Sequence, residues 1–174
     1  GMLFQGAALL QWLNVLDNVC LPLRQTRRLP EAEILRLAEE KLEMVGLTGA
    51  AEKMPADISG GMRKRVGLAR AIVTQPEIVL YDEPTSGLDP VISRQIDLLI
   101  DDLRRRLGVT SVVVTHDLNS ALYIGTRVAM LHEGRMVVCA TPEEFIASKQ
   151  PVVRDFLQAQ GIADLQDVRK AFGK

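Results

Sequence analysis

The stretch Ile78-Val79-Leu80-Tyr81-Asp82-Glu83-Pro84 decides the fold of this 174-residue chain. Four apolar residues in a row, ended by two acids and a proline, are typical of a short strand buried in a parallel sheet. Asp89-Pro90 then opens a long helix, with an aspartate cap and proline at the first helical position. Ser111-Val112-Val113-Val114 is a second buried-strand candidate. Strand, helix and strand in this order predict an α/β fold with a parallel sheet.

The sequence before this strand has a mostly helical pattern. Asn14 predicts the cap of a first helix, which Pro22 limits. Pro30 opens a second helix, which a left-handed Gly46 ends. A third helix follows Ser59-Gly60-Gly61, and we interpret its Arg63-Lys64-Arg65 run as a solvated helix face.

After the second strand the pattern predicts a helix near 118–124, a hairpin formed by 128–131 and 136–139, and a capping box that begins at Thr141. Two short tail helices are expected near 151–160 and 164–172. We divide the chain by pattern into a helical part, 1–75, a mainly parallel sheet with helices on its faces, 76–140, and a helical tail, 141–174.

Charge and cysteine usage exclude several classes of protein. The 21 Lys and Arg residues oppose 22 Asp and Glu residues, whereas proteins that bind nucleic-acid phosphates carry a basic excess. Cys20 and Cys139 lie far apart and outside any CxxC pattern, so neither a disulfide framework nor a zinc site is predicted. No apolar run approaches the roughly 18 residues of a membrane-spanning helix. We expect a reducing, cytosolic environment and no nucleic-acid partner.

Several residues are candidates for chemistry. Asp82-Glu83 stands at the carboxyl end of a strand, where one acid can hold Mg²⁺ and the other can orient an attacking water. Ser59-Gly60-Gly61 stands at a helix start, where exposed N–H groups favour a phosphate. His116 can bond a phosphoryl oxygen, and Gln5 can contact a metal or a water. Taken singly, each of these is also typical of a structural strand end, cap or turn.

Taken together, these groups occur in a specific order. Gln5 and the stretches 58–62, 78–84, 86–89 and 114–117 resemble the Q-loop, signature motif, Walker B strand with its glutamate, D-loop and H-loop of the ATP-binding subunits of ABC transporters. The resemblance reaches to about Thr141. It implies a partial P-loop NTPase fold in which a helical subdomain precedes the sheet. ATP and Mg²⁺ are the implied cofactors, and a head-to-tail pair of ATPase subunits is the implied assembly.

The resemblance also implies roles for individual residues. Glu83 would position the water for in-line attack, and His116 would bond the γ-phosphate and support that geometry. The residues that would contact ATP or its Mg²⁺ are Gln5, Asp82, Ser59, Gly60 and Gly61, with Gln5 and Asp82 nearest the metal. The serine and two glycines would touch an ATP that the partner subunit holds. Across the dimer interface the resemblance places Ser86, Gly87 and Asp89.

Several stretches resemble one branch of this family. Residues 59–72 and 115–121, together with 4–9, 14–19 and 22–24, are similar to the ATPases of Mla-type phospholipid transport at the Gram-negative envelope. We therefore expect a subunit that drives phospholipid transport, peripheral on the cytoplasmic face of the inner membrane and bound to a transmembrane permease. Met62 also occurs at this position in peptide importers. Another cargo, such as peptides, amino acids or an exported compound, therefore stays open.

The phosphate-binding pattern GxxxxGK[ST], which precedes the Q-loop in the family, has no counterpart in the sequence. Because the later motifs are intact, including Glu83 and His116, we interpret the chain as a fragment that lacks this loop rather than as a decayed enzyme. The complete protein is then expected to be an ATPase, and the isolated chain to be inactive. The alternative is a non-catalytic docking module, with Trp12 exposed on an apolar surface formed by residues 7–23.

Overall fold

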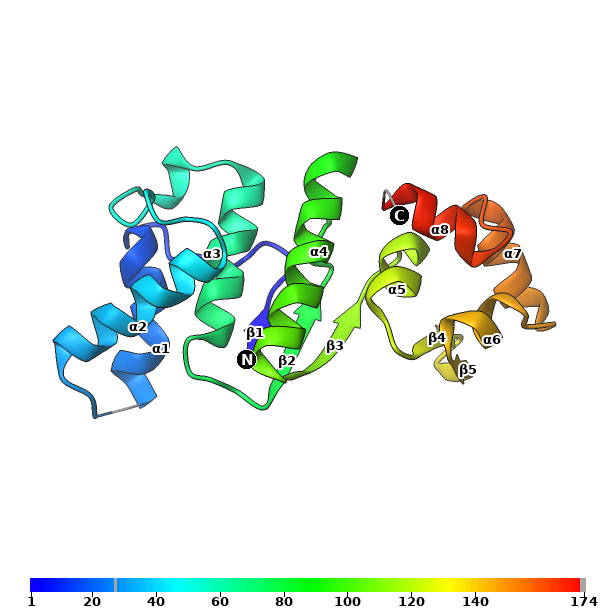
Figure 1. The fold of residues 1–174 in the computed structure, drawn as a ribbon, viewed down its shortest axis with the longest axis horizontal. Coiled ribbons are helices and arrows are strands. Elements are labelled where there is room, and N and C mark those ends of the chain that lie inside the picture. The colour runs from blue at the N-terminus through cyan, green and yellow to red at the C-terminus, as the bar shows by residue number, and fades with distance from the viewer. Residues whose placement is uncertain (27, 173–174) are drawn as a thin grey trace. The chain divides into compact units, whose positions relative to one another are not determined.

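The computed structural model describes residues 1–26 and 28–172, and their contacts group into two compact units, Gly1–Val114 and Thr115–Lys174 (Figure 1). The boundary falls directly after the strand that precedes His116. The sequence pattern divides the chain into functional parts, residues 1–75, 76–140 and 141–174, and this division stays a prediction. No helix among the described residues has both the length and the apolar character that a bilayer crossing requires.

The first unit contains a sheet of three parallel strands (Figure 1). They are β1 (Met2–Leu3), β2 (Ile78–Asp82) and β3 (Thr110–Val114), in the order β1-β2-β3. Helix α4 (Pro90–Leu107) connects β2 to β3, and its Asp89 cap and left-handed Gly108 stop are both confirmed. The predicted parallel sheet is therefore also confirmed. The pattern does not predict β1, because two residues are too few to show a period.

The apolar runs of this sheet are buried on one face only. Val79 and Tyr81 are buried, whereas Ile78 and Leu80, which alternate with them in β2, are 52% and 43% exposed. Neighbouring residues of a strand point to opposite faces, so a continuous apolar run predicts a strand covered on both faces. That prediction is wrong here, because within the described chain only one face of β2 is covered.

Among the described residues of the first unit, three further helices pack on one another: α1 (Val15–Thr26), α2 (Glu31–Met44) and α3 (Gly60–Ile72). A 3-10 turn, Pro55–Asp57, precedes α3. The Asn14 cap is confirmed, since its side-chain oxygen accepts the Asp17 N–H at 2.7 Å. Gly46 is left-handed as predicted, and Trp12 is 74% exposed.

Pro22 does not limit α1, which is a correction to the sequence prediction. The proline lies inside the helix, and α1 continues to Thr26, whose hydroxyl donates to the Pro22 carbonyl at 2.5 Å. A proline removes one helical hydrogen bond. The buried residues Val19 and Leu23 on either side of it pack into the core and stabilise the helix through this position.

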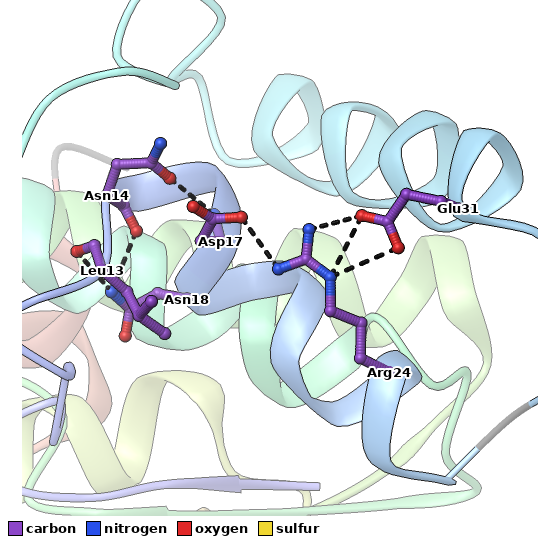
Figure 2. A network of polar contacts seen from close by, with 6 residues as sticks. All are labelled: Leu13, Asn14, Asp17, Asn18, Arg24 and Glu31. Carbon is purple, nitrogen blue, oxygen red and sulfur yellow. Dashed lines mark hydrogen bonds and ion pairs between the residues drawn. The ribbon is translucent and has the colours of Figure 1, made fainter.

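One buried asparagine holds the chain that enters α1 (Figure 2). The Asn18 side-chain amide donates to the carbonyls of Leu13 and Asn14 at 3.0 and 2.9 Å. It also donates to the Leu10 carbonyl at 3.1 Å. Its oxygen accepts the Leu10 N–H at 2.8 Å. All hydrogen-bonding atoms of this side chain thus have partners, which makes its complete burial tolerable.

Arg24 links two helices of the first unit (Figure 2). Its guanidinium donates to Asp17 on α1 at 2.8 Å and to Glu31 at the start of α2 at 2.5 Å. These ion pairs are partly exposed, so their contribution is orientation of α2 against α1 more than stability.

The second unit has a small core of its own. It consists of α5 (Leu118–Ile124), the antiparallel hairpin of β4 (Val128–His132) and β5 (Arg135–Ala140), α6 (Pro142–Ile146), α7 (Pro151–Ala159) and α8 (Leu165–Ala171). The Thr141 capping box is confirmed. Leu157 and Ile162 of the tail pack with Leu118 and Phe145, so the tail belongs to this core.

Candidate functional site

The chain turns sharply where β2 ends. Glu83, directly after the strand, has a left-handed backbone with φ 44°, which is uncommon for a residue with a side chain. Its N–H donates to the Val114 carbonyl at 2.9 Å, and its carbonyl accepts the Ser86 N–H at 3.2 Å. The ladder to β3 therefore extends one residue past Asp82 before the chain folds back. The half-buried Asp82 and Glu83 both lie at the carboxyl edge of the sheet.

Gln5 reaches the same edge from the neighbouring strand. Leu3 of β1 pairs with Tyr81 of β2, so continuing the parallel register brings Gln5 level with Glu83. The Gln5 side-chain nitrogen donates to the Ser86 hydroxyl at 3.3 Å. Residues predicted for the Q-loop and the D-loop are therefore in direct contact, beside the predicted catalytic acid.

A buried lysine joins these turns. The Lys64 ammonium donates to the Gln5 carbonyl at 2.5 Å and to the Glu83 carbonyl at 2.9 Å, and the residue is only 5% exposed. Burial lowers the pKa of Lys64, while the nearby charges of Glu83 and Asp82 act to raise it. The prediction of a solvated helix face for the 63–65 run is thus wrong for Lys64. Composition alone does not predict that Lys64 is buried, because it does not show which side of the helix the sheet covers.

The predicted phosphate-binding stretch forms the first turn of α3. Ser59 is its cap, and the Ser59 hydroxyl oxygen accepts the N–H three residues on at 3.3 Å. Gly60 and Gly61 follow, where backbone N–H groups have no acceptor within the helix. A Cβ on Gly61 would lie 2.7 Å from a methyl carbon of Ile92, and one on Gly60 would lie 3.3 Å from Leu88. The glycines therefore also permit α3 to approach the start of α4 closely.

The predicted interface residues lie between these two features. Gly87 is exposed and left-handed, with φ 76°. Asp89 is exposed as well, and its carboxylate accepts the N–H groups of Val91 and Ile92 at 3.0 Å. Its confirmed structural role is thus the cap of α4, and its contact with a partner stays a prediction, as do those of Ser86 and Gly87.

His116 belongs to the second unit, where it is exposed at the entry to α5. Its carbonyl accepts the Gln160 side-chain amide at 2.8 Å, and Asp117 caps α5 by accepting the Asn119 N–H at 2.9 Å. These bonds hold the backbone on both sides of the imidazole. The predicted approach of His116 to the γ-phosphate stays a prediction.

The side chains at the sheet edge and the helix tip fit a nucleotide with Mg²⁺. Carboxylate and amide oxygens such as those of Asp82 and Gln5 suit this hard cation, and a Mg²⁺ that arrives on phosphates needs few protein ligands. Among the described residues no group of three or more His, Cys, Asp or Glu side chains gathers into a metal site. At the helix tip, the Ser59 hydroxyl hydrogen and the Gly60 and Gly61 N–H groups are the donors that phosphate oxygens accept.

Comparisons with known proteins agree with these motifs. The family described as "ABC transporter" matches residues 1–86. A probable ribonucleotide transport ATP-binding protein, mkl, of Mycobacterium leprae is 43% identical over 165 residues, which are 95% of this chain and 48% of that protein. The intermembrane phospholipid transport system ATP-binding protein MlaF of Escherichia coli K12 is 43% identical over 163 residues, 94% of this chain and 60% of that protein.

Solved structures show the same likeness. A dimeric ATP-binding cassette, MJ0796, in a post-hydrolysis state with ADP and Pi superposes with a TM-score of 0.72 at 36% identity, over 82% of this chain and 62% of that one. The structure of cbiO1 from Clostridium perfringens, part of an ABC transporter complex, gives 0.78 at 29% identity, over 96% and 66%. The chain spans 48% and 60% of the lengths of the two curated relatives.

Proposed function

We propose that this chain, whose residues 1–86 match the ABC transporter family, forms the part of an ATP-binding subunit that positions the attacking water during ATP hydrolysis. One observation carries the proposal. Gln5, Glu83 and Ser86 come from three different predicted motifs and meet beside Asp82 at the carboxyl edge of the sheet.

In this function the side chains act mainly by position and charge. Glu83 would accept a hydrogen bond from the water and orient it for in-line attack, and His116 would bond the γ-phosphate. Asp82 and Gln5 would hold Mg²⁺, which supplies charge stabilisation when it is bound with ATP. Ser59, Gly60 and Gly61 would complete the site of a partner subunit.

The similarity to this family also supports a proposal for the partners and the place of action. We propose a head-to-tail pair of ATPase subunits, for which the dimeric relative gives support, and a transmembrane permease that the pair drives from the cytoplasmic face of the inner membrane. Phospholipid is the proposed cargo. It is supported by the 59–72 and 115–121 stretches and by the name of the E. coli relative, whereas the mycobacterial relative, named for ribonucleotide transport, is equally similar.

The test is a Glu83→Gln substitution in the complete subunit. We expect turnover to fall by about 10²- to 10⁴-fold, as for loss of a positioned general base, while ATP binding persists. Steady-state hydrolysis and an ATP-binding titration measure the two quantities. Glu77→Gln is the control, because Glu77 is an exposed acid just before the same strand. Unchanged turnover in Glu83→Gln would remove Glu83 from the proposed role.

A further inference from the structure

One side of α3 carries the chain segment that contains Gln5. Lys64, Gly67 and Arg70 lie three residues apart along the helix and face this segment in turn. A Cβ on Gly67 would lie 2.6 Å from a methyl carbon of Leu3 and 3.2 Å from the Ala7 Cβ, so a side chain at this position would force its neighbours to shift. The Arg70 guanidinium donates to the Ala7 carbonyl at 2.5 Å and to the Ala8 carbonyl at 2.8 Å.

The segment that α3 holds is strained. Ala7 and Ala8 both have left-handed backbones, with φ 61° and 45°. Each such residue with a side chain costs about 1 kcal/mol or more, and the conformation persists only where surrounding contacts impose it. The bonds from Arg70, together with the bond from Lys64 to Gln5, are contacts of this kind. The shape of the Gln5 loop is therefore set by α3.

Lys64 connects this loop to a second turn. An ammonium has three donors and no acceptor, and Lys64 uses two of its donors on carbonyls that come from Gln5 and from Glu83. The Glu83 carbonyl belongs to the peptide that directly follows the left-handed residue. Fixing the plane of that peptide also fixes the backbone from which the Glu83 carboxylate extends.

We propose that Lys64 is a positioning residue that ties the Glu83 turn and the Gln5 loop to helix α3, whose tip is Ser59-Gly60-Gly61. A displacement of α3, such as nucleotide contact at its tip would produce, then moves both turns together. The role of Lys64 in turnover rests on the proposed ATPase function, whereas its role in holding the two turns does not.

The structural half of the proposal is tested on this chain by amide hydrogen exchange. In Lys64→Met the Ser86 and Ala7 amides, which close the two turns, are expected to exchange about tenfold faster, since a typical hydrogen bond contributes about that factor. Lys41→Met is the matched control, because Lys41 is also a buried lysine but lies on α2 against Glu40. Unchanged exchange at Ser86 and Ala7 in Lys64→Met overturns the proposal.

Two further variants keep the test decisive. Lys64→Arg retains donors for two carbonyls and is expected to restore slow exchange at both amides. If Lys64→Met does not fold, Lys64→Gln replaces it, since it retains donors but loses the charge and the reach. We expect the Ser86 and Ala7 amides of Lys64→Gln to exchange faster than in the wild type but less than tenfold faster. Wild-type exchange in Lys64→Gln at both turns counts against the proposal.

The functional half is tested by kinetics of the complete subunit. Lys64→Met is expected to lower kcat for ATP by about 10²-fold, as misplacement of a catalytic group does, with KM within about twofold and with most of kcat recovered in Lys64→Arg. A kcat equal to wild type, or a rise in KM that accounts for the whole effect, overturns the positioning role. A wild-type subunit without turnover refutes the proposed function instead, and leaves the exchange experiment to judge Lys64.

Discussion

At the scale of single residues, several polar groups gain their role from burial. Asn18 is an ordinary polar residue in the sequence, yet in the fold it satisfies four backbone groups at the entry to α1. Lys64 similarly joins two turns that are far apart in the chain. Such groups are retained inside a protein only when they are hydrogen-bonded, so their neighbours must come to them.

Cys20 provides a pH-dependent prediction at this scale. The residue is fully buried, and burial raises the pKa of its thiol from 9.0 to about 11, with the Arg24 charge acting to lower it. The unfolded chain can ionise this thiol more easily than the folded one. The contribution of Cys20 to stability is therefore complete below pH 9 and is lost as pH rises from 9 to about 11.

We expect the urea midpoint of the wild-type chain to fall more steeply between pH 9 and 11 than that of a Cys20→Ala variant. Every other residue is common to the two proteins, so the difference between the two curves isolates Cys20. Cys139→Ala is the control, because Cys139 is exposed and should leave the wild-type slope unchanged. Parallel curves for wild type and Cys20→Ala would show that this thiol does not contribute in this way.

At the scale of elements, α3 organises the candidate site. Its first turn forms the Ser59-Gly60-Gly61 tip, its second turn carries Lys64, and its later turns seat the Gln5 loop through Gly67 and Arg70. The sequence predicts the helix and its cap correctly. Lys64, Gly67 and Arg70 all lie on the side of α3 that packs against the sheet and the Gln5 loop. Local spacing does not show whether a lysine or an arginine lies on the packed side of a helix, because both side chains can be buried along their length.

The approach of α3 to α4 gives a prediction about helix packing. In Gly61→Ala the new Cβ would lie 2.7 Å from the methyl carbon on the Ile92 Cβ, and the strong χ1 preference of isoleucine in a helix makes moving that methyl costly. We expect a loss of about 1–3 kcal/mol of unfolding free energy in urea denaturation. Adding Ile92→Ala should relieve part of the clash. The double variant should therefore lose less unfolding free energy than the two single variants lose in total.

Gly49 supplies the matched control for this prediction. A Cβ there would meet nothing within 4 Å, so Gly49→Ala is expected to change stability by less than about 0.5 kcal/mol. Strict additivity of the Gly61 and Ile92 substitutions would mean that the two helices do not restrain each other at this contact.

At the scale of the whole molecule, each compact unit has its own core. In the second unit Phe145 is almost completely buried among Leu118, Val128 and Leu157. Phe145→Ala is expected to cost about 3–5 kcal/mol, because it removes a large buried ring and leaves a cavity. Faster amide exchange throughout α5 and α7 would report this loss.

Leu131 is the control within the same unit, since it lies in β4 but is 72% exposed. Leu131→Ala should change the stability of α5 and α7, as derived from their amide exchange, by no more than about 0.5 kcal/mol. Equal effects of the two substitutions would contradict the assignment of Phe145 to the core.

The sequence by itself determined where most of the helices and the two five-residue parallel strands lie, and the order of the motifs. Each of these predictions rests on a local signal within a few neighbouring residues. The signals are the Ser59, Asp89 and Thr141 caps, the left-handed Gly108 and the apolar runs of β2 and β3. Only the tertiary structure decided that β1 joins the sheet, that Gln5 touches Ser86 and that Lys64 is buried between two turns. These contacts depend on residues that are distant in the chain and on which faces of the elements become covered. The spacing of residues within one segment predicts neither.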